Sequence, residues 1–69
     1  MNRTAVSSSN ISSIGYDENN STLEVEFKNR RIYHYFNVPS QEHANLMRAS
    51  SHGKHLANHI IGNYRDEEQ

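Results

Sequence analysis

With 69 residues, the chain suits one small domain and is too short to bury a large core. It has no cysteine, which excludes disulfides, thiolate zinc sites and a cysteine nucleophile. Seven Lys and Arg residues against eight Asp and Glu residues give a formal net charge of −1, so no overall basic field attracts nucleic acid.

The two ends of the chain are polar and carry no apolar periodicity. We expect residues 1–8 to form a flexible arm, residues 9–64 a single domain and residues 65–69 a charged tail. We expect no signal peptide, because the first ten residues contain no apolar run, and no run in the sequence approaches the roughly 20 apolar residues of a membrane helix. These features predict a cytoplasmic protein without a membrane contact.

Three segments have the pattern of β-strands. Residues 11–16 form an irregular apolar run that indicates a first strand with a bulge near Gly15. Residues 22–28 alternate between apolar and polar side chains, which is typical of a half-buried strand. A turn at residues 28–31 then leads into a third strand at residues 32–37, so the three strands predict an antiparallel meander.

Two segments after Pro39 have helical spacing, at residues 40–49 and 54–62. The second repeats apolar side chains at Leu56, Ala57, Ile60, Ile61 and Tyr64. The whole pattern predicts an α+β domain of order β-β-β-α-α, in which two short helices pack on one face of a three-stranded sheet.

The length of the hairpin loop determines where Tyr33 and Tyr35 lie. A two-residue loop at Asn29 and Arg30 places both tyrosines on the outer face, where they form an aromatic surface for bases or a protein partner. A three-residue loop with a bulge moves both into the core and puts His34 outside. The binary pattern favours the two-residue loop, because it gathers more apolar side chains on one face.

Two further groups are candidate contacts for phosphate. Lys28, Arg30 and Arg31 form a dense basic cluster at the hairpin tip, although basic residues also commonly keep exposed turns soluble. The segment from Ser51 through Gly53 to Lys54 places a hydroxyl, a glycine and a cation at an expected helix start, where an anion or a plain helix corner fits.

Chemical activity has little support in the sequence. His52, His55 and His59 are weak candidates for a metal site, because two of them are spaced i, i+4 but no third ligand converges on them. No nucleophile motif and no buried pair of carboxylates is apparent. We therefore expect a non-enzyme without metal or cofactor.

Short motifs along the chain are similar, in order and spacing, to those of one family. They are Ser9-Asn10-Ile11, Ile14-Gly15-Tyr16-Asp17, Thr22-Leu23-Glu24-Val25-Glu26-Phe27, Tyr33-His34-Tyr35, Val38-Pro39, Ser51-His52-Gly53-Lys54 and residues 60–64. Together they cover about residues 7–64 and resemble the KTSC domain. That family occurs at the C-terminus of some bacterial lysyl-tRNA synthetases and as small bacterial and phage proteins with a central Tyr-x-Tyr.

The resemblance implies RNA or tRNA binding, which the synthetase context suggests for the family. It assigns the Tyr-x-Tyr to Tyr33 and Tyr35 and the Ser-x-Gly-Lys to Ser51, Gly53 and Lys54. Similar domains usually have Asn-Gly in the hairpin where this chain has Asn29 followed by arginine. The rival hypothesis is a protein-interaction module, bacterial or phage-encoded, that binds a host factor or forms a homodimer; monomer and homodimer are both open.

Overall fold

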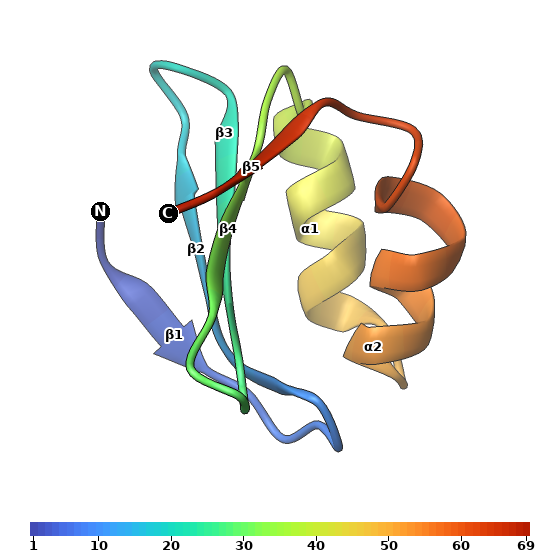
Figure 1. The fold of residues 1–69 in the computed structure, drawn as a ribbon. Helices are drawn as coiled ribbons and strands as arrows, with labels where there is room; N and C mark the ends of the chain where they lie inside the picture. Colours follow the sequence, from blue (N-terminus) through green and yellow to red (C-terminus); the bar gives the residue numbers. More distant parts are fainter.

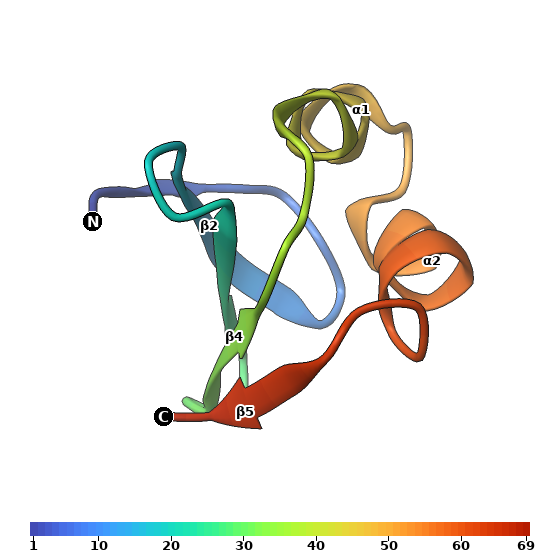
Figure 2. The same cartoon turned by 90° about the horizontal axis from the view of Figure 1, so that it is seen from above.

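The computed structural model describes residues 1–69 as a five-stranded antiparallel sheet with helices on one face (Figure 1). The elements are β1 Arg3–Ala5, β2 Ile11–Asp17, β3 Thr22–Phe27, β4 Ile32–Tyr35, α1 Ser40–Arg48, α2 His52–His55, the π-helical turn η1 Leu56–Ile60 and β5 Asp66–Glu68. The strands follow one another in chain order, and α1 and α2 lie on the same side of them (Figure 2). The α+β class and the meander are confirmed. No helix has both the length and the apolar character needed to cross a membrane.

The expected number of three strands was wrong, because a short strand lies at each end of the chain. β1 falls within the expected arm at residues 1–8 and pairs Arg3 with Gly15 on β2. β5 falls within the expected charged tail at residues 65–69 and pairs Asp66 with Tyr35 on β4. Both strands have three exposed residues and no apolar alternation, so sequence pattern does not reveal them.

Nine buried apolar side chains fill the space between the sheet and the helices. They are Ile11, Ile14, Leu23, Val25, Tyr35, Val38, Leu46, Leu56 and Ile60. Leu23 and Val25 alternate along β3 as the pattern predicts, whereas Ile11 and Ile14 on β2 are three positions apart across its irregularity. Leu46 comes from α1 and the last two from η1. Burial of this cluster is the main source of stability in a chain without disulfides.

The irregularity in β2 lies earlier than expected. The pairing of β2 with β3 shifts between Ile11 and Ser13, and Gly15 pairs regularly with Glu24. Gly15 has another role, because a Cβ atom there would lie 2.8 Å from the main-chain oxygen of Asn2. The absence of a side chain lets the N-terminal segment lie directly against β2.

The second helical segment begins and ends earlier than the expected residues 54–62. It starts at His52, because Ser51 caps it by accepting a hydrogen bond of 3.2 Å from the main-chain N–H of Lys54. After the turn η1, Ile61 adopts an extended backbone with ψ 126°. Ile61, expected on the apolar face, is therefore 46% exposed.

The hairpin between β3 and β4 has a three-residue loop. The main-chain N–H of Phe27 donates to the oxygen of Arg31 over 2.9 Å, and the N–H of Arg30 donates to the oxygen of Phe27 over 2.9 Å. Arg30 has φ +72°, which is the left-handed residue of a bulged three-residue hairpin. Asn29 Oδ1 accepts from the main-chain N–H of Arg31 over 3.0 Å and stabilises the turn.

This loop selects the register that the binary pattern disfavoured. Val25 pairs with Tyr33 and Leu23 with Tyr35, so both tyrosines point toward the helices and Tyr35 is 2% exposed. The preferred register was wrong, because it would have put His34 in the core. A buried imidazole needs a polar partner, and the observed register gives it one on the outer face.

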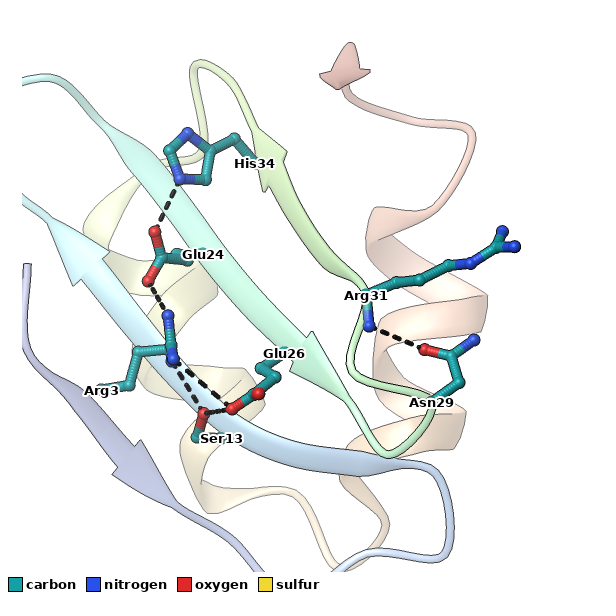
Figure 3. Close-up of polar contacts among 7 residues, drawn as sticks. All are labelled: Arg3, Ser13, Glu24, Glu26, Asn29, Arg31 and His34. Atoms are coloured by element: carbon teal, nitrogen blue, oxygen red, sulfur yellow. Dashed lines mark hydrogen bonds and ion pairs between the residues drawn. The ribbon is translucent and has the colours of Figure 1, made fainter. Parts of the chain in front are cut away.

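The outer face carries a network of charged side chains that runs from β1 to β4 (Figure 3). Arg3 contacts the carboxylates of Glu24 and Glu26. Its Nε–H also donates to Ser13 Oγ over 2.9 Å. His34 Nε2 lies 2.7 Å from Glu24 Oε1. Partial burial raises the pKa of the Glu24 carboxyl, but the hydrogen bonds from His34 and Arg3 outweigh burial and hold that pKa below its usual range. The network thus ties β1, β3 and β4 together.

We expect Arg30→Gly to raise the free energy of unfolding by about 1 kcal/mol, because glycine adopts a positive φ without the Cβ clash that an L-residue suffers. Urea denaturation of both proteins measures the change. Arg31→Gly is the control, since Arg31 has no positive φ and should lose stability on substitution. Equal losses of stability in both variants would contradict the left-handed backbone conformation of Arg30.

Candidate nucleic-acid interface

Three chain segments meet at the end of the sheet that holds the β3–β4 hairpin (Figure 1). The main-chain N–H of Lys28 donates to the oxygen of Asn10 over 2.9 Å, which joins the hairpin to the β1–β2 connection. A Cβ atom on Gly53 would lie 2.4 Å from Asn10 Oδ1, so the start of α2 packs closely against the same asparagine. The two basic groups that the sequence predicts therefore lie at one end of the domain.

We define the basic end as the exposed side chains Lys28, Arg30, Arg31 and Lys54. Only Arg31 among them pairs with a carboxylate, at 3.9 Å from Glu68 Oε2. The other three take part in no salt bridge. Their charges are therefore free for an external anion.

The other two members of the Ser51–Lys54 segment have structural tasks. The Ser51 side chain caps α2, as described above, and is engaged by a main-chain N–H. Gly53 makes room for Asn10, which any side chain would displace. Of the three predicted residues in this segment, Lys54 alone is left to contact a partner.

An aromatic groove of about 340 Å³ lies beside the basic end on the helix side of β4. Its lining consists of Phe27, Asn29, Arg31, Tyr33, Tyr35, Ile61 and Asp66. The Tyr33 ring lies 5.8 Å from Phe27 in an edge-to-face arrangement of 83°, and 6.4 Å from Tyr35 at 27°. The three rings form one row along the hairpin, because the register puts Tyr33 and Tyr35 on the same face as Phe27.

Two carboxylates of β5 lie beside the groove, Asp66 opposite Tyr35 and Glu68 opposite Tyr33. Tyr33 donates its hydroxyl hydrogen to Glu68 Oε1 over 3.3 Å. Burial, with smaller contributions from the charge of Asp66 and from Tyr33, raises the pKa of Tyr35 to about 12. Tyr35 therefore stays a neutral hydroxyl at the groove floor, and Tyr33 is the tyrosine whose ring is partly open to solvent.

A second pocket of about 340 Å³ adjoins the start of α2 and is wholly polar. It is lined by Ser7, Ser8, Ser9, Ser50, Ser51 and His52. Its side chains carry hydroxyl and imidazole groups without a cationic residue. The pocket offers hydrogen bonds to a neutral polar group but little attraction for a phosphate.

The three histidines considered as metal ligands do not converge. His52 donates from Nδ1 to the carbonyl oxygen of Leu46 over 2.9 Å. His55 Nε2 lies 2.8 Å from Glu42 Oε1, and the rings of His55 and His59 are 4.5 Å apart. No group of three His, Cys, Asp or Glu side chains is arranged to hold a metal ion.

The sequence did not reveal three residues on which this interface depends. Asn10 lies in a polar segment and was seen only as part of a motif, without a role. Ile61 was assigned to a helix face, and Asp66 to a tail. Chain order alone does not indicate that a C-terminal strand returns beside β4. No sequence pattern therefore predicts that carboxylates lie beside the groove.

A spectrophotometric titration of the tyrosines should contain one phenol that ionises near pH 12. We expect Tyr35→Phe to remove this component and Tyr33→Phe to leave it, because the raised pKa belongs to the buried ring. The raised pKa also predicts that stability is complete below about pH 10 and falls between about 10 and 12, as the unfolded phenol ionises first. A wild-type titration without a component above the usual range would contradict the placement of Tyr35.

Comparison with known proteins agrees with this fold. The family model described as KTSC domain matches residues 7–64. A crystal structure of a KTSC domain protein from Yersinia pestis has a TM-score of 0.96 at 40% sequence identity, and the alignment covers 99% of this chain and 96% of that one.

Two relatives are similar in sequence. An uncharacterized protein of Stutzerimonas stutzeri (strain A1501) is 42% identical over 56 residues, which are 81% of this chain and 79% of that protein. A lysine–tRNA ligase of Nostoc punctiforme (strain ATCC 29133 / PCC 73102) is 33% identical over 58 residues, which are 84% of this chain and 10% of the ligase. The resemblance that the motifs indicated is confirmed, and the chain belongs to the KTSC domain family.

Proposed function

We propose that this KTSC domain is a small non-catalytic module that binds single-stranded RNA. The observation that carries the proposal is the continuity of the basic end with the aromatic groove, which share Arg31 and meet at the hairpin loop. Single-stranded nucleic acid is commonly bound by cations that follow its backbone beside rings that stack on its bases. This arrangement offers both within one small surface.

Phosphate attraction comes from the local distribution of charge and not from the net charge of −1. Lys28, Arg30 and Lys54 have no carboxylate partner and lie at one end of the sheet. Asp17 and Glu18 lie at the β2–β3 turn, which the antiparallel topology places at the other end. The unpaired cations at the hairpin are thus separated from these two carboxylates, which favours the approach of a phosphate to the hairpin.

Base contact comes from Phe27 and Tyr33 at the open part of the groove. Their edge-to-face rings, 5.8 Å apart, present an aromatic corner beside Arg31. Tyr35 supports the row from below and is too buried to stack on a base itself. In this proposal the first tyrosine of the Tyr-x-Tyr contacts a base and the second supports the first.

The relatives supply one further argument. One of them is by name a lysine–tRNA ligase, which acts on an RNA, and the similar segment makes up 10% of it. A domain that accompanies such an enzyme and carries a basic end fits an RNA-binding role. The histidine contacts described above place no imidazole against a serine hydroxyl, and we therefore propose binding without catalysis.

Fluorescence anisotropy with a labelled single-stranded RNA at low salt tests the proposal. We expect Lys28→Gln and Lys54→Gln each to weaken binding and to reduce the slope of log affinity against log salt by about 0.7 per lost phosphate contact. Tyr33→Leu, which keeps apolar volume, should cost about 1 kcal/mol of binding through lost stacking.

Arg65→Gln is the matched control, because it removes one positive charge at the far end of β4, where Arg65 lies over the Phe36 ring. Its affinity should stay near that of the wild type. If Arg65→Gln and Lys54→Gln lost equal affinity for RNA, only the net charge of the domain would matter. That result would contradict a defined interface.

A protein-interaction module is the second candidate. Ile61 is 46% exposed and lines the aromatic groove, and a solvent-exposed isoleucine beside aromatic rings suits an apolar side chain of a partner. The edge strands β1 and β5 offer main-chain pairing to a second copy. Absence of RNA binding together with sedimentation as a dimer would favour this candidate over the first.

A further inference from the structure

Asp66 introduces an unpaired negative charge into the aromatic groove. Its main chain pairs with Tyr35 at the start of β5, and the residue lines the groove together with the aromatic row. It takes part in no salt bridge, whereas the neighbouring Glu68 contacts both Tyr33 and Arg31. The Asp66 side chain is exposed, so both of its oxygens are open to a ligand that donates hydrogen bonds.

A carboxylate repels phosphate but accepts hydrogen bonds from N–H groups, since an ionised aspartate has only acceptor atoms. The bases differ in the donors that they offer. Guanine presents N1–H and the N2 amino group side by side, which match the two oxygens of one carboxylate. Adenine and cytosine offer one amino group next to an acceptor nitrogen, and uracil offers one N–H between two carbonyl oxygens, which a carboxylate repels.

The rest of the groove suits the same base. Asn29 Oδ1 is occupied by the main-chain N–H of Arg31, so the amide NH₂ is the part of Asn29 that is left to donate to an acceptor on the ligand. Phe27 and Tyr33 supply the stacking surface. A volume of about 340 Å³ is near the lower limit of ligand pockets, which run from about 300 Å³ upward, and thus fits one base and not a duplex.

We propose that the aromatic groove binds one unstacked guanine of single-stranded RNA, whose N1–H and N2 amino group donate to the Asp66 carboxylate. The inference rests on the proposed RNA-binding function and adds base specificity to it. The phosphates on either side of the guanine then lie toward the basic end, where Lys28 and Arg30 have no carboxylate partner. The aromatic groove thus selects the base, and the adjoining basic end attracts the phosphates of the RNA backbone.

The test uses the full chain and short oligouridylate RNAs that carry a single guanosine, adenosine or cytidine at the centre, with the all-uridine RNA as reference. We expect the guanosine RNA to bind about tenfold more tightly than the others, because a good bidentate pair is worth about 1–3 kcal/mol of discrimination. Asp66→Asn should abolish this preference while RNA binding itself is retained.

Glu67→Gln is the matched control, because it removes the same charge from the next residue of β5, which pairs with His34 and faces away from the groove. It should keep the guanosine preference. Circular dichroism before each titration confirms that both variants are folded.

The possible results separate the two proposals. Equal affinity for all four RNAs would overturn guanine recognition and leave RNA binding standing. A guanosine preference that survives Asp66→Asn would overturn the role of Asp66. Failure of every RNA to bind, with binding of an arginine-containing peptide instead, would overturn both and assign the groove to a protein partner.

Discussion

The left-handed backbone of Arg30 determines the face on which every side chain of β4 lies. With φ +72° at this residue, the hairpin closes through a three-residue loop, and Tyr33 and Tyr35 turn toward the helices. His34 then meets Glu24 on the outer face at 2.7 Å. A loop shorter by one residue would exchange the two faces, because side chains alternate along a strand. The core, the outer network and the aromatic groove all depend on this one backbone conformation.

The interface depends in addition on Asn10, which lies between the hairpin and the start of α2. The main-chain oxygen of Asn10 accepts a hydrogen bond from the N–H of Lys28. The Asn10 side chain occupies the space that a side chain on Gly53 would need. Segments more than 40 positions apart in the chain are thereby fixed at one end of the sheet, since Asn10 and Gly53 are in direct contact. The basic end is for this reason a property of the tertiary structure, and the hairpin sequence supplies only part of it.

The sequence predicts the parts of the fold that leave an apolar period. Leu23 and Val25 alternate as a half-buried strand, and both are fully buried. The loop length was not predictable from binary pattern, because tyrosine and histidine suit either face; the cost of burying His34 decides the register. Lys28 was identified as a candidate from the basic cluster at the hairpin tip, and Lys54 from its place at an expected helix start and from the family motif. Asp66 was not identified, because a three-residue edge strand is formed by pairing and carries no pattern of its own.

The central claim is that single-stranded RNA binds where the hairpin loop, Asn10 and α2 meet. Nitrogen–proton correlation spectra of the labelled domain, recorded during titration with a single-stranded RNA, test it most directly. The account predicts shifts that cluster on the main chain of Lys28, Tyr33 and Lys54 and around Asp66, while Ser13 and Glu24 on the outer face stay unchanged. Shifts confined to the outer face, or none at saturating RNA, would contradict it.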